Sequence, residues 1–220
     1  MAALDAGLMR GQRGLIACSV LTGGAFILEH GLALPVFFNV HAFCMLLAVS
    51  VLLPLVTSSL WTADPTHGSK KRQAHAKTAY SLLVLVGLAM VGILLHKYNL
   101  EKPLLSFSMH ASAGWAILAA FTVQGFSGHR KLLSMEQSGL RMYRWHGLSG
   151  AALSVCAYGV LALGLLKMLS STAAVAAALA GCVIPAVYNA TLFIRRYYTV
   201  RMTSVYTSVP AFDDAPPDTV

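Results

Sequence analysis

Charged residues are scarce in this chain of 220 residues, where Asp, Glu, Lys and Arg together make up only 11%. Soluble domains carry about 25% charged residues. A chain with so little charge cannot cover a water-facing surface, and 57% of its residues are hydrophobic. The composition therefore excludes an ordinary soluble domain and predicts a membrane protein.

Cysteines and acidic residues are also few, with 4 Cys and 8 Asp or Glu. The cysteines lie inside hydrophobic stretches and include no CxxC pair, which argues against a disulfide framework or a zinc site. No acidic residue lies in the middle of a hydrophobic stretch. A proton or metal pathway through a transporter typically contains such carboxylates. The cysteines are Cys18, Cys44, Cys156 and Cys182.

Hydrophobic residues occur in six blocks of about 20 residues, the length of a helix that crosses a ~30 Å hydrocarbon core. In lipid the backbone must satisfy its own hydrogen bonds, so each block is predicted to be a helix. We therefore expect an all-α membrane protein with an N-terminal segment at 1–13, a six-helix domain at 14–196 and a disordered tail at 197–220. The predicted spans are 14–34, 41–61, 75–96, 106–126, 146–168 and 173–194.

Basic residues lie mainly on one side of the predicted spans. Of the 16 Lys and Arg residues, all but three flank the span ends that face the two termini. By the positive-inside rule both termini are cytoplasmic. The net charge of +8 is thus an orientation signal, and because its residues are divided among four membrane-edge segments we expect no nucleic-acid binding. The three residues on the far side are Lys97, Lys102 and Lys167.

Four of the 8 histidines recur once per predicted crossing. His41, His75, His110 and His146 are separated by about one helix plus one loop. Because consecutive spans run in opposite directions, His41 and His110 fall near the non-cytoplasmic side, and His75 and His146 near the cytoplasmic side. A lone histidine at a helix end is usually an interfacial residue, whereas ionisable groups within spans tend to face the bundle and serve a function.

Two histidine pairs, one toward each membrane face, match the ligand requirement of haem, whose iron accepts two axial imidazoles. Zinc takes four ligands, commonly with Cys or carboxylate help, and no carboxylate lies near these histidines. Small residues at 111–114 and 147–151 allow a flat ring to approach, although ordinary helix packing explains them equally well. Two haems near opposite ends of ~30 Å helices would leave an edge-to-edge gap much shorter than the membrane.

The segments around two of these histidines resemble motifs of the cytochrome b-561 family. FFNVHAFCM, residues 37–45, resembles the family's motif around its first ligand, with Ala42 where proline is usual. FSMHASAGW, residues 107–115, is similar to the family form YSLHSWxG. At the end of the second span the chain has LVTSSLWTADP where many members have an LLVYR-like stretch.

The resemblance covers about residues 14–196 and implies a transmembrane ascorbate-dependent reductase whose helices two to five form a four-helix core. It implies two b-type haems, held by His75 with His146 and by His41 with His110. Cytosolic ascorbate would reduce the first, and the second would reduce monodehydroascorbate or a ferric chelate. A homodimer is compatible with the family pattern. The membrane is left open among an endomembrane vesicle, the endoplasmic reticulum and the plasma membrane.

Basic residues beside the cytoplasmic histidines are the candidate ascorbate site, because ascorbate is an anion and Lys and Arg side chains can hold it. On the far side His96 can bind ferric iron or pass a proton, and Lys97 can attract an anionic chelate. For both groups, a role in orientation or interfacial anchoring stays open. The cytoplasmic candidates are Lys71, Lys77, Arg144, Arg72 and Arg141.

Two other functions stay open from the sequence. A multi-pass transporter or channel would use the membrane histidines as a proton or metal path. A scaffolding protein would act through its C-terminal tail and would be indifferent to the four spaced histidines.

Overall fold

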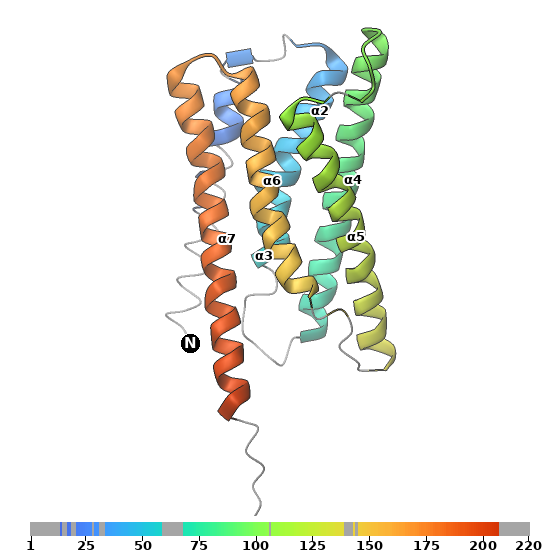
Figure 1. The fold of residues 1–220 in the computed structure, drawn as a ribbon, viewed down its shortest axis with the longest axis vertical. Coiled ribbons are helices and arrows are strands. Elements are labelled where there is room, and N and C mark those ends of the chain that lie inside the picture. Colours follow the sequence, from blue (N-terminus) through green and yellow to red (C-terminus); the bar gives the residue numbers. More distant parts are fainter. Residues whose placement is uncertain are drawn as a thin grey trace, which may run out of the picture.

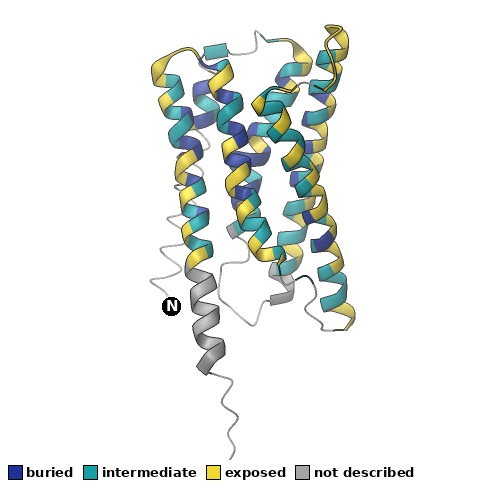
Figure 2. Cartoon of the chain, viewed as in Figure 1, coloured by how far each residue is buried: buried dark blue, intermediate teal, exposed yellow. Residues whose placement is uncertain are grey.

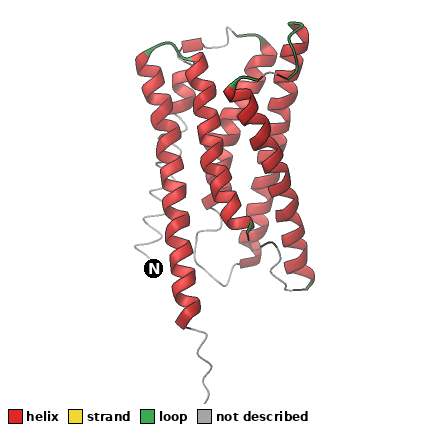
Figure 3. Cartoon of the chain, in the orientation of Figure 1, coloured by secondary structure: helices red, strands yellow, loops and turns green. Residues whose placement is uncertain are grey.

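The structure of the protein, a computed structural model, describes residues 14, 17–18, 21–27, 29–30, 34–58, 68–105, 107–138, 143 and 145–206. For residues 58, 68–71 and 195–206 it describes the backbone alone. Helices run side by side through these ranges, and no described residue lies in a strand (Figure 1 and Figure 3). The all-α prediction is therefore confirmed for this part of the chain.

Three consecutive elements form one continuous helical rod. Helix α2 (Val36–Leu47) continues through a π-helical turn, η1 (Ala48–Leu52), into α3 (Leu53–Ser58). A π-helical turn inserts an extra residue into a helix and often marks a functional region. The remaining helices are α4 (Gly68–Asn99), α5 (Met109–Gln137), α6 (His146–Met168) and α7 (Thr172–Tyr206).

Four helical stretches among the described residues are long and apolar enough to cross a membrane. They are Val36–Thr57, Arg72–Asn99, His146–Met168 and Thr172–Ile194. Helix α5 has 29 residues, but His110 and Gln124 lie within its apolar part and lower its mean hydropathy. The region before residue 34 is described only in part. The membrane character is thus supported by four helices, and the count of six spans stays a prediction.

Several helices extend beyond the predicted spans at the end of the bundle where α4 and α6 begin. Helix α5 continues to Gln137, so Arg130 and Lys131, which we expected in a loop, lie on a helix. Helix α4 begins at Gly68, before the predicted start at 75, and the backbone of α7 continues to Tyr206. Hydropathy shows only where a helix leaves the hydrocarbon, because a helix that enters water still satisfies its own backbone.

Neighbouring helices in the bundle are antiparallel. The side chain of His41, near the start of α2, contacts the backbone of Ala89 in the second half of α4. His110, at the start of α5, likewise contacts Val160 in the second half of α6. The starts of α2 and α5 therefore share one end of the bundle with the ends of α4 and α6. This arrangement determines which of the candidate site residues lie close together.

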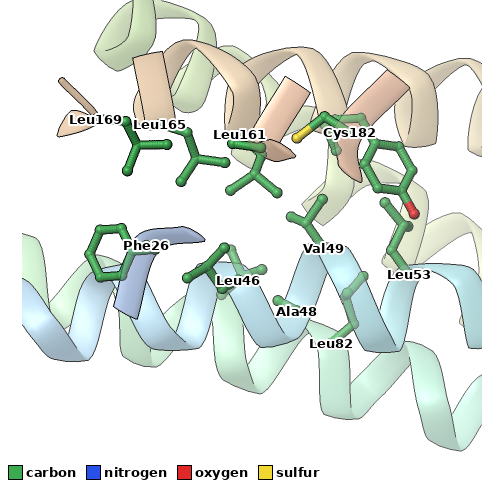
Figure 4. Packing of buried hydrophobic residues seen from close by; sticks show 14 residues of the cluster. Phe26, Leu46, Ala48, Val49, Leu53, Leu82, Leu161, Leu165, Leu169 and Cys182 are labelled. Carbon is green, nitrogen blue, oxygen red and sulfur yellow. The ribbon is translucent and has the colours of Figure 1, made fainter. Parts of the chain in front are cut away.

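The apolar core is formed by residues of α2, η1, α3, α4, α6 and α7, together with Phe26. Figure 4 shows Leu161 and Leu165 of α6 facing Leu46 and Val49 across this core. Exposed residues gather on the outward faces of the helices (Figure 2). Many of these outward side chains are large and apolar, such as Val84, which is 62% exposed on α4. Such a surface suits a hydrocarbon environment, in which apolar side chains need no burial.

The residues before α2 are tied to the turn between α6 and α7. The carboxylate of Glu29 accepts hydrogen bonds from the backbone N–H and hydroxyl of Ser170 and from the N–H of Ser171. The ring Nε2 of His30 lies 2.6 Å from the carbonyl oxygen of Met168. These contacts satisfy backbone groups where one helix ends and the next begins.

Candidate functional site

Three of the four spaced histidines bond through Nδ1 to a backbone carbonyl of a neighbouring helix. The distances are 3.0 Å from His41 to Ala89 O, 2.8 Å from His75 to Val56 O and 3.0 Å from His110 to Val160 O. A carbonyl oxygen only accepts, so Nδ1 carries the proton in the neutral ring and Nε2 keeps its lone pair. Histidine ligands of metal centres are typically oriented in this way.

His146 is held by side chains instead. The hydroxyl of Ser127 on α5 donates to Gln124 O at 3.0 Å, and its oxygen lies 3.3 Å from His146 Nδ1. Because that hydroxyl proton is already used, the serine oxygen accepts from Nδ1–H. Gln124 also donates through Nε2 to His146 O at 2.6 Å and accepts from the Ser149 hydroxyl at 2.8 Å. His146 thus has the same free Nε2 through a different partner.

The pair His75 and His146 is brought together by α4 and α6. Their ring centres lie 6.5 Å apart, and their planes are inclined by 83°. Two imidazoles that bind one metal atom from opposite sides, with bonds of about 2.0 Å, have ring centres roughly 6 Å apart. The spacing is therefore compatible with one iron between them.

The far pair, His41 and His110, lines a cavity of about 390 Å³ at the other end of the bundle. This volume falls in the range of roughly 300–1,000 Å³ that small ligands and cofactors occupy. The rest of the wall is mainly apolar and comes from α2, α4, α5 and α6. Its members include Met45, Leu46, Met90, Ile93, Trp115 and Leu161.

Two glycines lie directly against histidine rings. A Cβ atom at Gly164 would lie 2.8 Å from Cε1 of His110, and one at Gly128 would lie 2.7 Å from Cε1 of His146. Such separations are shorter than van der Waals contact, so any larger residue there would displace the imidazole. Gly159, on the same helix as Gly164, has no atom that near. The two glycines therefore leave space for the imidazole rings that a larger side chain would occupy.

At each end of the bundle the described residues offer two imidazoles, the number of axial ligands that a haem takes from a protein. No group of three or more His, Cys, Asp or Glu side chains within the described ranges is placed to hold a metal ion. Haem brings four nitrogen ligands of its own and needs only two from the protein. One imidazole pair at each end, an apolar cavity and two ring-flanking glycines meet that requirement.

The other predicted site residues are placed as follows. His96 packs edge-on against Phe38, with ring centres 5.3 Å apart. Lys97 lines the far cavity, and its Nζ donates to Leu104 O at 2.8 Å. At the other end of α4, near His75, Arg72 is half-buried and Lys77 is exposed. Of Lys71 only the backbone is described, and Arg141 and Arg144 lie outside the described residues.

Sequence reasoning missed the residues that support the histidines, namely Gln124, Ser127, Gly128 and Gly164, and it gave Lys167 no role. Gln124 is the one of these with a recognisable signal, because it is a polar residue inside an apolar block. Ser127 follows one helical turn later on the same face. The glycines carry no local signal, since the chain contains 18 of them.

Comparison with known proteins gives no independent indication of what this site does. The interpretation of the site therefore depends on the contacts described above. No protein-family model, curated protein or solved structure matches this chain.

Proposed function

We propose that this chain is a transmembrane electron-transfer protein that holds two b-type haems, one between His75 and His146 and one between His41 and His110. A b-type haem gains and loses single electrons, so a pair at opposite ends of the bundle supplies the redox chemistry for transfer across a membrane. The observation that carries the proposal is the shared orientation of four imidazoles, each bonded through Nδ1 to another helix.

The electron donor in this proposal is cytosolic ascorbate, an anion. Arg72 and Lys77 are available on α4 near His75 to attract it. Lys71, Arg141 and Arg144, whose side chains lie outside the described residues, are the other basic candidates by their position in the sequence. Lys and Arg differ here, because a guanidinium can bind two oxygen atoms in a fixed geometry whereas an ammonium acts as a point charge.

The electron acceptor is monodehydroascorbate or a ferric chelate on the non-cytoplasmic side. His96 and Lys97 lie at that end of α4, beside the cavity that contains His41. The apolar wall of this cavity excludes water and leaves the rim to make polar contacts with the acceptor. The chain would act as a multi-pass membrane protein with both termini in the cytoplasm.

A visible spectrum tests the proposal directly. The full-length protein, purified from haem-replete cells, is expected to contain two haems per chain and to show sharp reduced bands after ascorbate is added. His75→Ala combined with His146→Ala should remove one of the two haems. His129→Ala is the matched control, because this exposed histidine on α5 bonds to Tyr80 and not to the site.

Two results would contradict the proposal. One is a colourless preparation from haem-replete cells. The other is equal loss of haem in the His129→Ala control and in the double variant, which would show that haem content merely follows folding. Proteoliposomes with ascorbate on the cytoplasmic face and ferric citrate on the other complete the test, because reduction of ferric citrate should require both histidine pairs.

A further inference from the structure

Two lysines from different helices line the far cavity together. Lys97 is in the last turn of α4, and Lys167 is in the last turn of α6. Both are far-side residues by the positive-inside rule, and they account for two of the three lysines there. Lys167 is exposed, whereas Lys97 is half-buried and its Nζ donates to the carbonyl oxygen of Leu104, which also lines the cavity.

The position of each lysine along its helix explains why both line the same cavity. On α4 the lining residues Met90, Ile93, Leu94 and Lys97 follow one another at helical spacing, so Lys97 is the outermost member of that face. On α6 Lys167 comes one turn after Gly164, the glycine against His110. Lys167 therefore lies about one turn beyond the residue that contacts His110, and Lys97 lies about two turns beyond Ala89, whose carbonyl oxygen contacts His41.

The described residues that line the cavity include no Asp or Glu, and their other polar members are Ser108 and the two histidines. Lys97 and Lys167 line the same cavity as His41 and His110, so their charges act on any group that is bound there. Cations at the edge of an apolar cavity attract an anionic group, which such a site binds more strongly than water-exposed lysines do.

We propose that Lys97 and Lys167 form a two-point clamp for the carboxylate groups of the molecule that occupies the His41–His110 cavity. The identity of that molecule rests on the proposed function, and two sources provide the same chemistry. One is the pair of propionate groups of haem itself. The other is a soluble carboxylate, such as citrate with ferric iron, at the mouth of the cavity.

An ordinary role for these lysines makes a different prediction. Lysines near helix C-termini complement the helix dipole and reach toward lipid headgroups without binding any ligand. Lys102 allows the two roles to be separated, because it is exposed on the same side, in the loop after α4, and does not line the cavity. Lys102→Gln is therefore the matched control for charge and orientation.

The first experiment titrates full-length apoprotein with haem and with haem dimethyl ester, which lacks free carboxylates, and follows Soret absorbance. With Lys97→Gln and Lys167→Gln combined, we expect haem binding at one of the two sites to weaken about tenfold or more. Lys102→Gln should bind haem like the unmodified protein, and Lys167→Arg should retain affinity. The ester should bind all variants alike, which would identify the propionates as the source.

The second experiment measures citrate binding by calorimetry, with and without bound haem. If the soluble carboxylate is the source, the double variant loses about tenfold in citrate affinity while its haem affinity is unchanged. The clamp is refuted if the double variant matches Lys102→Gln for both haem and citrate. A protein that binds no haem at all would overturn the proposed function, whereas its citrate affinity would still decide whether the lysines form the clamp.

Discussion

The four spaced histidines differ in what holds them. Backbone carbonyls orient three of them, and no side-chain substitution removes a carbonyl. His146 is oriented by a side chain, the hydroxyl of Ser127. A hydrogen bond from Nδ1 to an acceptor makes the imidazole a stronger electron donor through Nε2. The site therefore has one partner that mutagenesis can remove without touching a histidine.

Ser127→Ala is expected to change the properties of the centre held by His75 and His146. Without the acceptor at Nδ1, His146 donates less electron density and its ring is less firmly oriented. We expect a more positive reduction potential and about a tenfold loss of haem affinity at this centre. A redox titration followed at the haem bands measures both centres. Ser127→Thr retains the hydroxyl and should behave like the unmodified protein, and equal potentials in all three would contradict the role of Ser127.

Gly164→Ala tests the space beside His110. The added methyl group would lie 2.8 Å from Cε1 of the ring, so the imidazole must rotate away from its bond to Val160 O. We expect loss of most of the haem held by His41 and His110, measured as haem content per chain. The control is Gly159→Ala on the same helix, where nothing lies within 4 Å. If both variants keep two haems, the His110 ring tolerates a methyl group at position 164 and the prediction is wrong.

At the scale of whole elements, α2 and α4 approach closely at Gly92. A Cβ atom there would lie 2.9 Å from the carbonyl oxygen of Phe37 and 3.1 Å from the backbone N of His41. Backbone atoms cannot rotate out of the way as a side chain can, so a larger residue must push the helices apart. Close contacts of this kind at small residues are typical of helix pairs in membranes. The position of His41 against α4 depends on this contact.

Gly92→Ala is expected to destabilise the bundle by about 1–3 kcal/mol, the usual cost of overpacking. The measurement is the loss of folded protein in detergent as temperature rises, followed by size-exclusion chromatography. Gly87→Ala, also on α4, has no atom within 4 Å of the new methyl group. It should be neutral or slightly stabilising, because Ala favours helix over Gly by about 1 kcal/mol. Equal stability of the two variants would show that α2 and α4 separate without cost.

For the whole molecule, the antiparallel bundle separates the two histidine pairs to opposite ends. His75 and His146 lie near the starts of α4 and α6, whereas His41 and His110 lie near the starts of α2 and α5. Neither pair comes from helices that are consecutive in the chain. A function that needs one group at each membrane face therefore requires the assembled bundle, and no single helical hairpin can provide it.

His110→Ala tests this sidedness. The variant is expected to lose the haem on the far side and to keep rapid reduction by ascorbate from the cytoplasmic side. Stopped-flow absorbance of the remaining haem gives the rate, and haem content confirms the loss of one group. If reduction by ascorbate disappeared while the other haem remained bound, the assignment of His75 and His146 to the cytoplasmic face would be wrong.

Much of the architecture was open to prediction from the sequence. The apolar blocks indicated helices because a lipid environment leaves the backbone no other way to satisfy its hydrogen bonds. The histidine spacing placed His75 and His146 on one side and His41 and His110 on the other, because it matches the repeat of helix plus loop. Helix ends were predicted less well. Helix α5 continues past its predicted span, because hydropathy marks where an apolar block ends and not where the backbone stops being helical.

The supporting residues were decided by tertiary structure alone. Ser127 and Gly128 lie 19 and 18 residues before His146 in the chain, and Gly164 lies far beyond His110. Their contacts depend on how α5 and α6 are rotated and shifted against each other, which no local pattern encodes. Composition, hydropathy and spacing thus determined that histidines would occur in pairs at each end of a helical bundle. Packing between helices determined which nitrogen of each ring stays free and which lysines share a cavity with it, because both depend on distances between residues remote in the chain.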